Sequence, residues 1–125
     1  MSAPVPLFLL SFTCGLLFYR LLFLMIPRFF QKPLIRTVFK IRWHHWHTGI
    51  LLILVGAVIL VLTENIRVTV MFLGIGLGLT LDVFLSFFFV ETKREEELSA
   101  YRRSLNPTLL LGACVIVAVL LLSLR

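Results

Sequence analysis

Four long apolar runs, separated by shorter polar stretches, divide this chain of 125 residues. A helix needs about 20 mainly apolar residues to cross the hydrocarbon core of a bilayer, and the two shorter runs reach the lower limit once their flanking residues are included. The pattern therefore predicts an all-α integral membrane protein, with a single four-span domain over residues 1–125. The predicted transmembrane helices cover approximately residues 5–27, 47–63, 68–90 and 107–124.

The connection between the first and second predicted spans has a different pattern. In RFFQKPLIRTVFKIRW, residues 28–43, basic residues recur every four positions between apolar and aromatic ones. This spacing predicts an amphipathic helix with a basic face, starting near Pro33. Such a helix lies in the plane of the headgroups, so we expect an interfacial helix that contacts anionic phospholipid headgroups. Trp43 and Trp46 extend it into the aromatic belt of the membrane.

Composition agrees with membrane integration, and the distribution of charge predicts the orientation. The chain is 60% hydrophobic and 14% charged, which is unlike a soluble domain. Most of the basic residues lie in the connections 28–47 and 91–106. Two predicted spans separate these connections, so both lie on the same side of the membrane. Positively charged loops usually face the cytoplasm, so we expect both termini outside. The net charge of +6 then reflects topology, and no nucleic acid partner is expected.

Small residues mark one face of the third predicted span. In this span Gly74, Gly78 and Asp82 are spaced four apart and share one helix face. Glycines let the backbone of a second helix approach closely, which is a common packing device in membranes. Gly49 and Gly56 offer a similar surface on the second span. We expect these four glycines to pack helices, within the chain and in assembly with other chains.

Asp82 is a carboxylate inside a predicted span, where an ionisable group is costly without a partner. It lies roughly 12 Å from the cytoplasmic end of its helix at ~1.5 Å per residue. Arg20 on the first span lies at a similar depth, roughly 10 Å from the same side. The two side chains can form a bidentate ion pair. Alternatively, Arg20 extends its long side chain to the cytoplasmic interface.

The stretch RWHHWHTGI, residues 42–50, places three histidines at the cytoplasmic entry of the second span. If this helix begins near Ile41, His44 and His47 share one face, while His45 points about 100° away, toward the side of Gly49 and Gly56. His44, His47 and Asp82 would then converge as ligands for a divalent metal such as zinc or iron. The same convergence suits a proton relay. Histidines beside two tryptophans also suit a membrane interface without any ligand.

The sequence has none of the common signatures of nucleotide, hydrolase or metalloprotease sites. Four short helices enclose little room for a substrate. We therefore expect an assembly or accessory component, either a homo-oligomer or a subunit of a larger membrane complex, with a metal or proton site near the cytoplasmic face. Two alternatives remain. One is a membrane-embedded, metal-dependent enzyme acting on lipid or quinone, and the other is an oligomer that conducts protons or metal ions.

Overall fold

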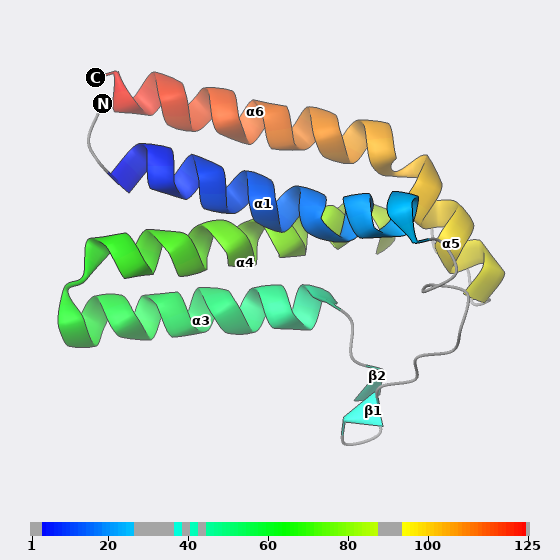
Figure 1. The fold of residues 1–125 in the computed structure, drawn as a ribbon, viewed down its shortest axis with the longest axis horizontal. Coiled ribbons are helices and arrows are strands. Elements are labelled where there is room, and N and C mark those ends of the chain that lie inside the picture. Colours follow the sequence, from blue (N-terminus) through cyan, green and yellow to red (C-terminus); the bar gives the residue numbers. More distant parts are fainter. Residues whose placement is uncertain (1–3, 27–36, 39–40, 43–44, 88–93, 125) are drawn as a thin grey trace.

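The computed structural model describes residues 4–26, 37–38, 41–42, 45–87 and 94–124 of the chain (Figure 1). Four of its helices are long and apolar enough to cross a membrane, which confirms the predicted helical bundle. A shorter, highly charged helix directly precedes the last of them. The elements are α1 (Pro4–Met25), β1 (Thr37–Val38), β2 (Ile41–Arg42), α3 (His45–Thr63), α4 (Ile66–Phe87), α5 (Arg94–Arg103) and α6 (Leu105–Ser123).

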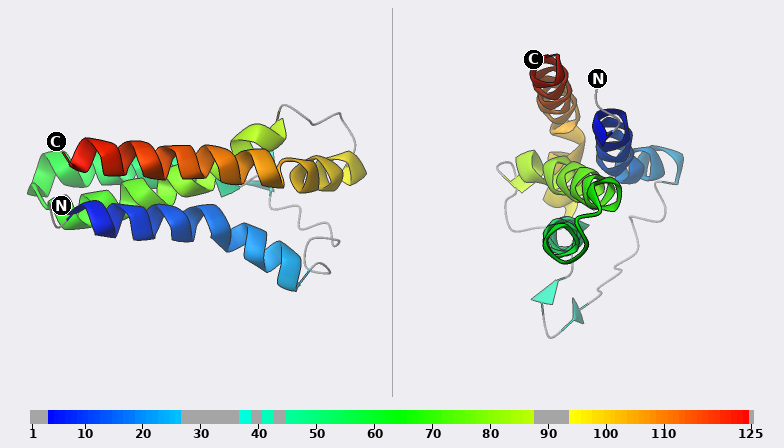
Figure 2. Two further views of the ribbon diagram at one scale, coloured as in Figure 1. Left: turned by 90° about the horizontal axis from the view of Figure 1, so that it is seen from above. Right: turned by 90° about the vertical axis from the view of Figure 1, so that its left-hand side faces the viewer.

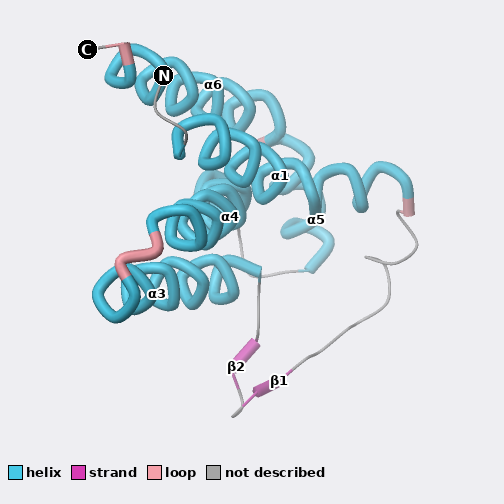
Figure 3. Tube along the Cα trace, turned by 60° about the vertical axis from the view of Figure 1, so that its left-hand side comes forward, coloured by secondary structure: helices cyan, strands magenta, loops and turns pink. Residues whose placement is uncertain are grey.

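Helix α4 occupies the centre of the bundle, between α1 and α3, and α6 lies beside α1 on the side of α4 away from α3, in contact with both (Figures 2 and 3). Within the most apolar stretch of each helix, 39% of residues are buried in α4 but 11% in α3 and in α6. Helices α3 and α6 therefore expose most of their apolar surface. The start of α1 and the end of α6 lie at the same end of the bundle as the α3–α4 hairpin (Figure 1).

Two residues connect α3 to α4 and form a tight hairpin. Glu64 adopts a left-handed backbone conformation, with φ of 53°, which ends α3. The side chain of Asn65 then accepts a hydrogen bond from the amide of Val68 at 3.2 Å, which satisfies one of the free donors at the start of α4. The shortness of this connection forces the two helices to run antiparallel.

Glycines bring α4 into backbone contact with both neighbours. A methyl group added at Gly78 would lie 2.4 Å from the carbonyl oxygen of Phe12 in α1, and one added at Gly74 would lie 2.8 Å from the Cβ of a serine in the same helix. On the other side, methyl groups at Gly49 and Gly56 would approach atoms of α4 to 2.5 and 3.0 Å. These four glycines thus pack helices within one chain, and their faces are not available to a second copy.

The described residues of the predicted interfacial helix are extended. Strands β1 and β2 pair in antiparallel fashion, with Thr37 opposite Arg42 and Val38 opposite Ile41. Three of these four residues are β-branched, which favours an extended backbone over a helix. The predicted interfacial helix therefore does not include these positions. The other residues of the segment 28–44 lie outside the described part of the chain.

Candidate functional site

A buried ion pair between Arg20 of α1 and Asp82 of α4 forms the centre of the candidate site. Both side chains are shielded, with 4% of Arg20 and none of Asp82 exposed. The Nε of Arg20 donates a hydrogen bond to Oδ1 of Asp82, and its Nη2 donates to the backbone carbonyl of Asp82 at 2.8 Å. The arginine side chain therefore turns into the bundle rather than extending to its surface.

Arg20 also attaches the junction of α5 and α6 to the bundle. Its Nη1 donates to the carbonyl oxygen of Tyr101 at 2.6 Å, and its guanidinium carbon lies 4.0 Å from the centre of that tyrosine ring. Its Nη2 lies 3.0 Å from the hydroxyl of Ser104 and 3.1 Å from that of Thr108. Both hydroxyl-bearing residues are almost completely buried. One guanidinium therefore links α1 to α4, to the end of α5 and to the first turn of α6.

The second oxygen of the carboxylate has two further donors. The Oδ2 of Asp82 lies 2.8 Å from the phenol oxygen of Tyr101, which donates a hydrogen bond, and 3.1 Å from Nε2 of His45. Asp82 is thus held by side chains from α1, α3 and α5. Donors on both oxygens offset the cost of removing the carboxylate from water.

Tyr101 lies in α5, outside the four long apolar helices. Burial raises the pKa of its phenol above the ordinary value of 10, and the negative charge of Asp82 raises this pKa further. Its ring also packs edge-on against Phe23, with the ring centres 5.4 Å apart. Tyr101 is therefore a protonated donor to Asp82 at neutral pH.

His45 is the first residue of α3, and its ring lies between two tyrosines. It stacks on Tyr19, with ring centres 4.3 Å apart and an angle of 17° between the planes, and it meets the Tyr101 ring edge-on at 6.3 Å. Its side chain is 18% exposed, so it forms the outer edge of the cluster. These contacts hold the imidazole plane in place beside Asp82.

The histidine that bonds to Asp82 is not one of the two expected to do so. His45 precedes Gly49 by four residues and shares its helix face, and this glycine face is the one that α3 packs against α4. The condition on which His44 and His47 would share the relevant face, a helix that begins near Ile41, is not met, since Ile41 lies in β2 and α3 begins at His45. The Gly49 spacing is thus the signal in the sequence that could have identified His45.

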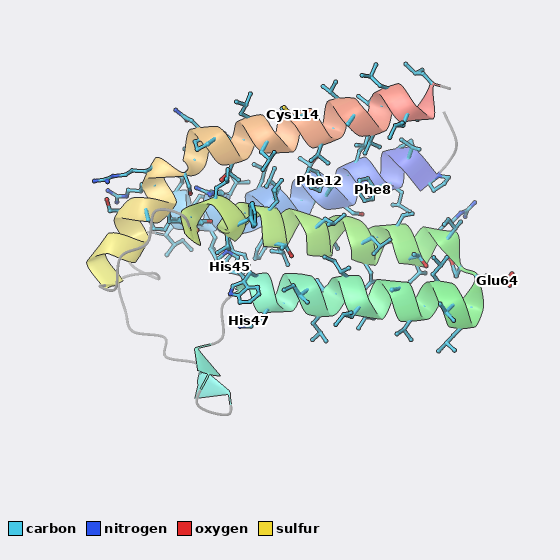
Figure 4. All side chains as sticks on the ribbon, turned by 180° about the vertical axis from the view of Figure 1, so that it is seen from behind. Phe8, Phe12, His45, His47, Glu64 and Cys114 are labelled. Carbon is cyan, nitrogen blue, oxygen red and sulfur yellow. The ribbon has the colours of Figure 1, made fainter. Side chains whose placement is uncertain are left out.

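The predicted metal ligands are only partly placed by the structure. His47 packs against Trp46, with ring centres 4.0 Å apart, and His44 lies outside the described residues. Figure 4 shows His45 and His47 at the start of α3, at the end of the bundle opposite Glu64. Within the described part of the chain, no group of three or more histidine, cysteine or acidic residues could hold a metal ion. The predicted set of His44, His47 and Asp82 stays a prediction, because it includes His44.

Comparison with known proteins finds no family model, no curated protein and no solved structure that matches this chain. The chemistry of the cluster is clear from its own geometry. The opposite charges of Arg20 and Asp82 offset each other, and the remaining contacts of both side chains connect separate helices. Such an arrangement holds helices in one relative position and orients the imidazole of His45.

Proposed function

We propose that this chain is a multi-pass integral membrane protein that acts as an assembly or accessory component, in a homo-oligomer or as a subunit of a larger membrane complex. The observation that carries this proposal is the complete burial of Asp82 together with the hydrogen bonds that both of its carboxylate oxygens accept. An enzyme or conductor that used this carboxylate would need access to it, but Asp82 is fully buried and has donors on both oxygens. These contacts support a role in holding the helices together.

The outer helices support both membrane integration and assembly. Large apolar side chains on the outer faces of α3 and α6 are exposed in the single chain, and surfaces of this size mark contact with lipid or with other proteins. The glycine faces are occupied within the chain, but these outer faces remain for a protein partner. Their most exposed members include Leu54, Val58, Val61, Leu110, Leu121 and Leu122.

The proposed orientation places the cluster on the cytoplasmic side. Arg102 and Arg103, at the end of α5, belong to one of the two strongly basic connections, and both are exposed. Arg67 is at the opposite end of the bundle, at the start of α4. Under the positive-inside rule, the end with α5 faces the cytoplasm and both termini face outward.

Light scattering on protein extracted in a mild detergent tests the assembly role. We expect a protein mass above that of one chain, either from several copies or from a co-extracted partner. Leu121→Trp, on the outer face of α6, should reduce this mass without lowering the unfolding temperature. Asp82→Asn should instead lower the unfolding temperature. A single chain with no partner, combined with unchanged stability of Asp82→Asn, would contradict the proposal.

Reconstituted vesicles separate this role from proton conduction. With a pH-sensitive dye inside the vesicles, we expect the same proton leak in vesicles with the protein as in empty ones. A leak that depends on the protein and disappears in a folded Asp82→Asn variant would overturn the accessory role in favour of conduction.

A metal ion held at His45 by fewer than three of the described side chains is the second candidate, because Asp82 bonds to the Nε2 of this imidazole. Carboxylates often orient metal-ligating histidines in this way, which leaves the other ring nitrogen for the ion. Elemental analysis of untagged protein tests this candidate. Near-stoichiometric zinc or iron in the wild type, absent from a folded His45→Ala variant but retained in Thr13→Val, would support it. No metal in the wild type would exclude it.

A further inference from the structure

Two neighbouring arginines at the end of α5 have no acidic partner among the residues that the structure describes. Arg102 and Arg103 occupy the last turn of α5, directly before α6, and both are exposed. No acidic residue lies three or four positions from either of them, the spacing that allows ion pairs along a helix. Among the described residues, the recorded ion pairs all involve Asp82. Within the described part of the chain, the positive charge of this pair is therefore not compensated.

Arg102 is positioned by contact with α1. Its guanidinium carbon lies 5.6 Å from the centre of the Phe23 ring, within the range of an attractive interaction between a cation and an aromatic face. Phe23 is buried and packs against Tyr101, which belongs to the same helix as Arg102. The end of α5 is thus attached to the last turns of α1, and the charge of Arg102 lies beside that helix.

The last turn of α1 also exposes a large apolar side chain: Leu24, which directly follows Phe23, is 65% exposed. Leu21 and Met25 are exposed as well, but they lie on the side of the helix opposite Phe23. A positive group at the border of an apolar surface matches the chemistry of a phospholipid, whose phosphate lies directly above its acyl chains. A free phosphate would use the arginines but not the apolar side chains.

We propose that Arg102 and Arg103, together with the exposed end of α1, bind an anionic phospholipid, with its phosphate at the guanidinium groups and an acyl chain along α1. This site rests on the proposed membrane integration. Charge complementarity selects an anionic lipid over a zwitterionic one, because the choline of phosphatidylcholine offsets the charge of its own phosphate. An arginine near a lipid surface contributes about a fivefold gain in binding of an anionic lipid.

Native mass spectrometry in an uncharged detergent, with short-chain phosphatidylglycerol and phosphatidylcholine in equal amounts, tests the site. We expect the wild type to retain phosphatidylglycerol preferentially. Arg102→Gln should raise the Kd for phosphatidylglycerol about fivefold, and the change of both arginines should raise it about 25-fold. Arg67→Gln is the matched control, since it removes one exposed arginine at the opposite end of the bundle and should leave the Kd unchanged. Leu24→Asn should weaken binding of the lipid without creating any affinity for inorganic phosphate.

Three results would overturn the site. Equal losses in Arg67→Gln and Arg102→Gln would show diffuse attraction to positive charge, and equal retention of the two lipids would show no headgroup selection. Displacement of the lipid by inorganic phosphate at the same concentration would show an anion site without an acyl component. Membrane integration has a separate test, extraction of cell membranes with alkaline carbonate, in which an integral protein stays in the pellet. Release of the chain there would refute the proposed function, whatever the lipid preference in detergent.

Discussion

Helices α4 and α6 are both long and apolar, but they are held in the bundle by different means. Helix α4 contacts its neighbours backbone to backbone, since an added Cβ at Gly78 would meet main-chain atoms of α1 at 2.4 and 2.6 Å. In α6, an added Cβ at Gly112 would instead meet the tip of the Leu16 side chain. The closest recorded polar contact of α6 with α1 is the hydrogen bond between Thr108 and Arg20.

This difference shows two ways of joining apolar helices. Inside a bilayer, lipid chains are as apolar as leucine, so association depends on close van der Waals packing and on hydrogen bonds between helices. The α1–α4–α3 layer uses close packing at glycines. Helix α6, most of whose surface is exposed, depends more on the polar contacts that Arg20 makes with Ser104 and Thr108. Variants that affect one mechanism should therefore leave the other intact.

The largest effect is expected from Asp82→Leu, which leaves the Arg20 guanidinium buried without its counter-charge. Breaking one partner of a buried pair costs about 3–5 kcal/mol, so we expect the variant to lose most of its folded protein in mild detergent. Thermal unfolding followed by tryptophan fluorescence measures the loss. The double variant Arg20→Leu with Asp82→Leu should be more stable than Asp82→Leu alone. If it is equally unstable, the two side chains are not coupled and the central contact of the cluster is wrong.

The next largest effect is expected from glycine substitutions, which distinguish α4 from α6. Gly78→Ala forces the α1 backbone to move, and overpacking of this kind costs about 1–3 kcal/mol in unfolding free energy. Gly112→Ala should cost less than Gly78→Ala, because the added methyl group meets only the end of the Leu16 side chain, which can shift more easily than a backbone. Chemical unfolding of the two variants side by side checks this order. Equal costs would contradict the different packing of α4 and α6.

Thr108→Val tests the polar attachment of α6 with almost no change in volume. Loss of its hydroxyl removes an acceptor from Arg20, which we expect to cost about 1 kcal/mol in unfolding free energy. Thr13→Val in α1 is the control, since among the described residues that hydroxyl bonds only to the Leu9 carbonyl of its own helix, at 2.8 Å. A loss no greater than that of the control would show that α6 is held mainly by apolar contacts.

The smallest effect is expected from alkaline pH, which should weaken the attachment of α5 through Tyr101 and leave it unchanged near neutral pH. Because burial raises the pKa of this phenol in the folded state, its contribution to stability is complete below the unfolded value of 10 and is lost as pH rises above it. Unfolding temperatures measured from pH 9 upward should fall more steeply in the wild type than in Tyr101→Phe, which has no phenol to titrate there. Parallel curves would show that Tyr101 does not contribute to this loss.

The apolar helices were predictable because their signal is local. Each depends on the length of one hydrophobic run, and the observed bounds of α1 and α3 differ from the predicted spans by no more than two residues. The need of Asp82 for a partner was also evident, and residue counting placed Arg20 at the same depth. The extended pair at Thr37–Val38 and Ile41–Arg42 was missed, since a basic repeat of four residues outweighed the β-branched positions.

The partners within the cluster were less accessible to sequence reasoning. Tyr101, Ser104 and Thr108 lie in or just after a charged stretch, and nothing in their spacing points to Arg20. His45 was assigned to the correct face of its helix, the face of Gly49, but that face was not recognised as the one that meets α4. Predicting this contact requires the rotation of each helix about its axis, which hydrophobic length leaves undefined.

By itself, the sequence determined four apolar helices, a short hairpin between two of them and one carboxylate within an apolar helix that needs a partner, because run length, turn chemistry and desolvation depend on nearby residues. The tertiary structure alone decided that His45 and Tyr101 share Oδ2 of Asp82 and that Arg20 reaches the start of α6. Those contacts join residues up to 88 positions apart. They exist because close packing at glycines sets the helix rotations, and these rotations determine which polar side chains meet.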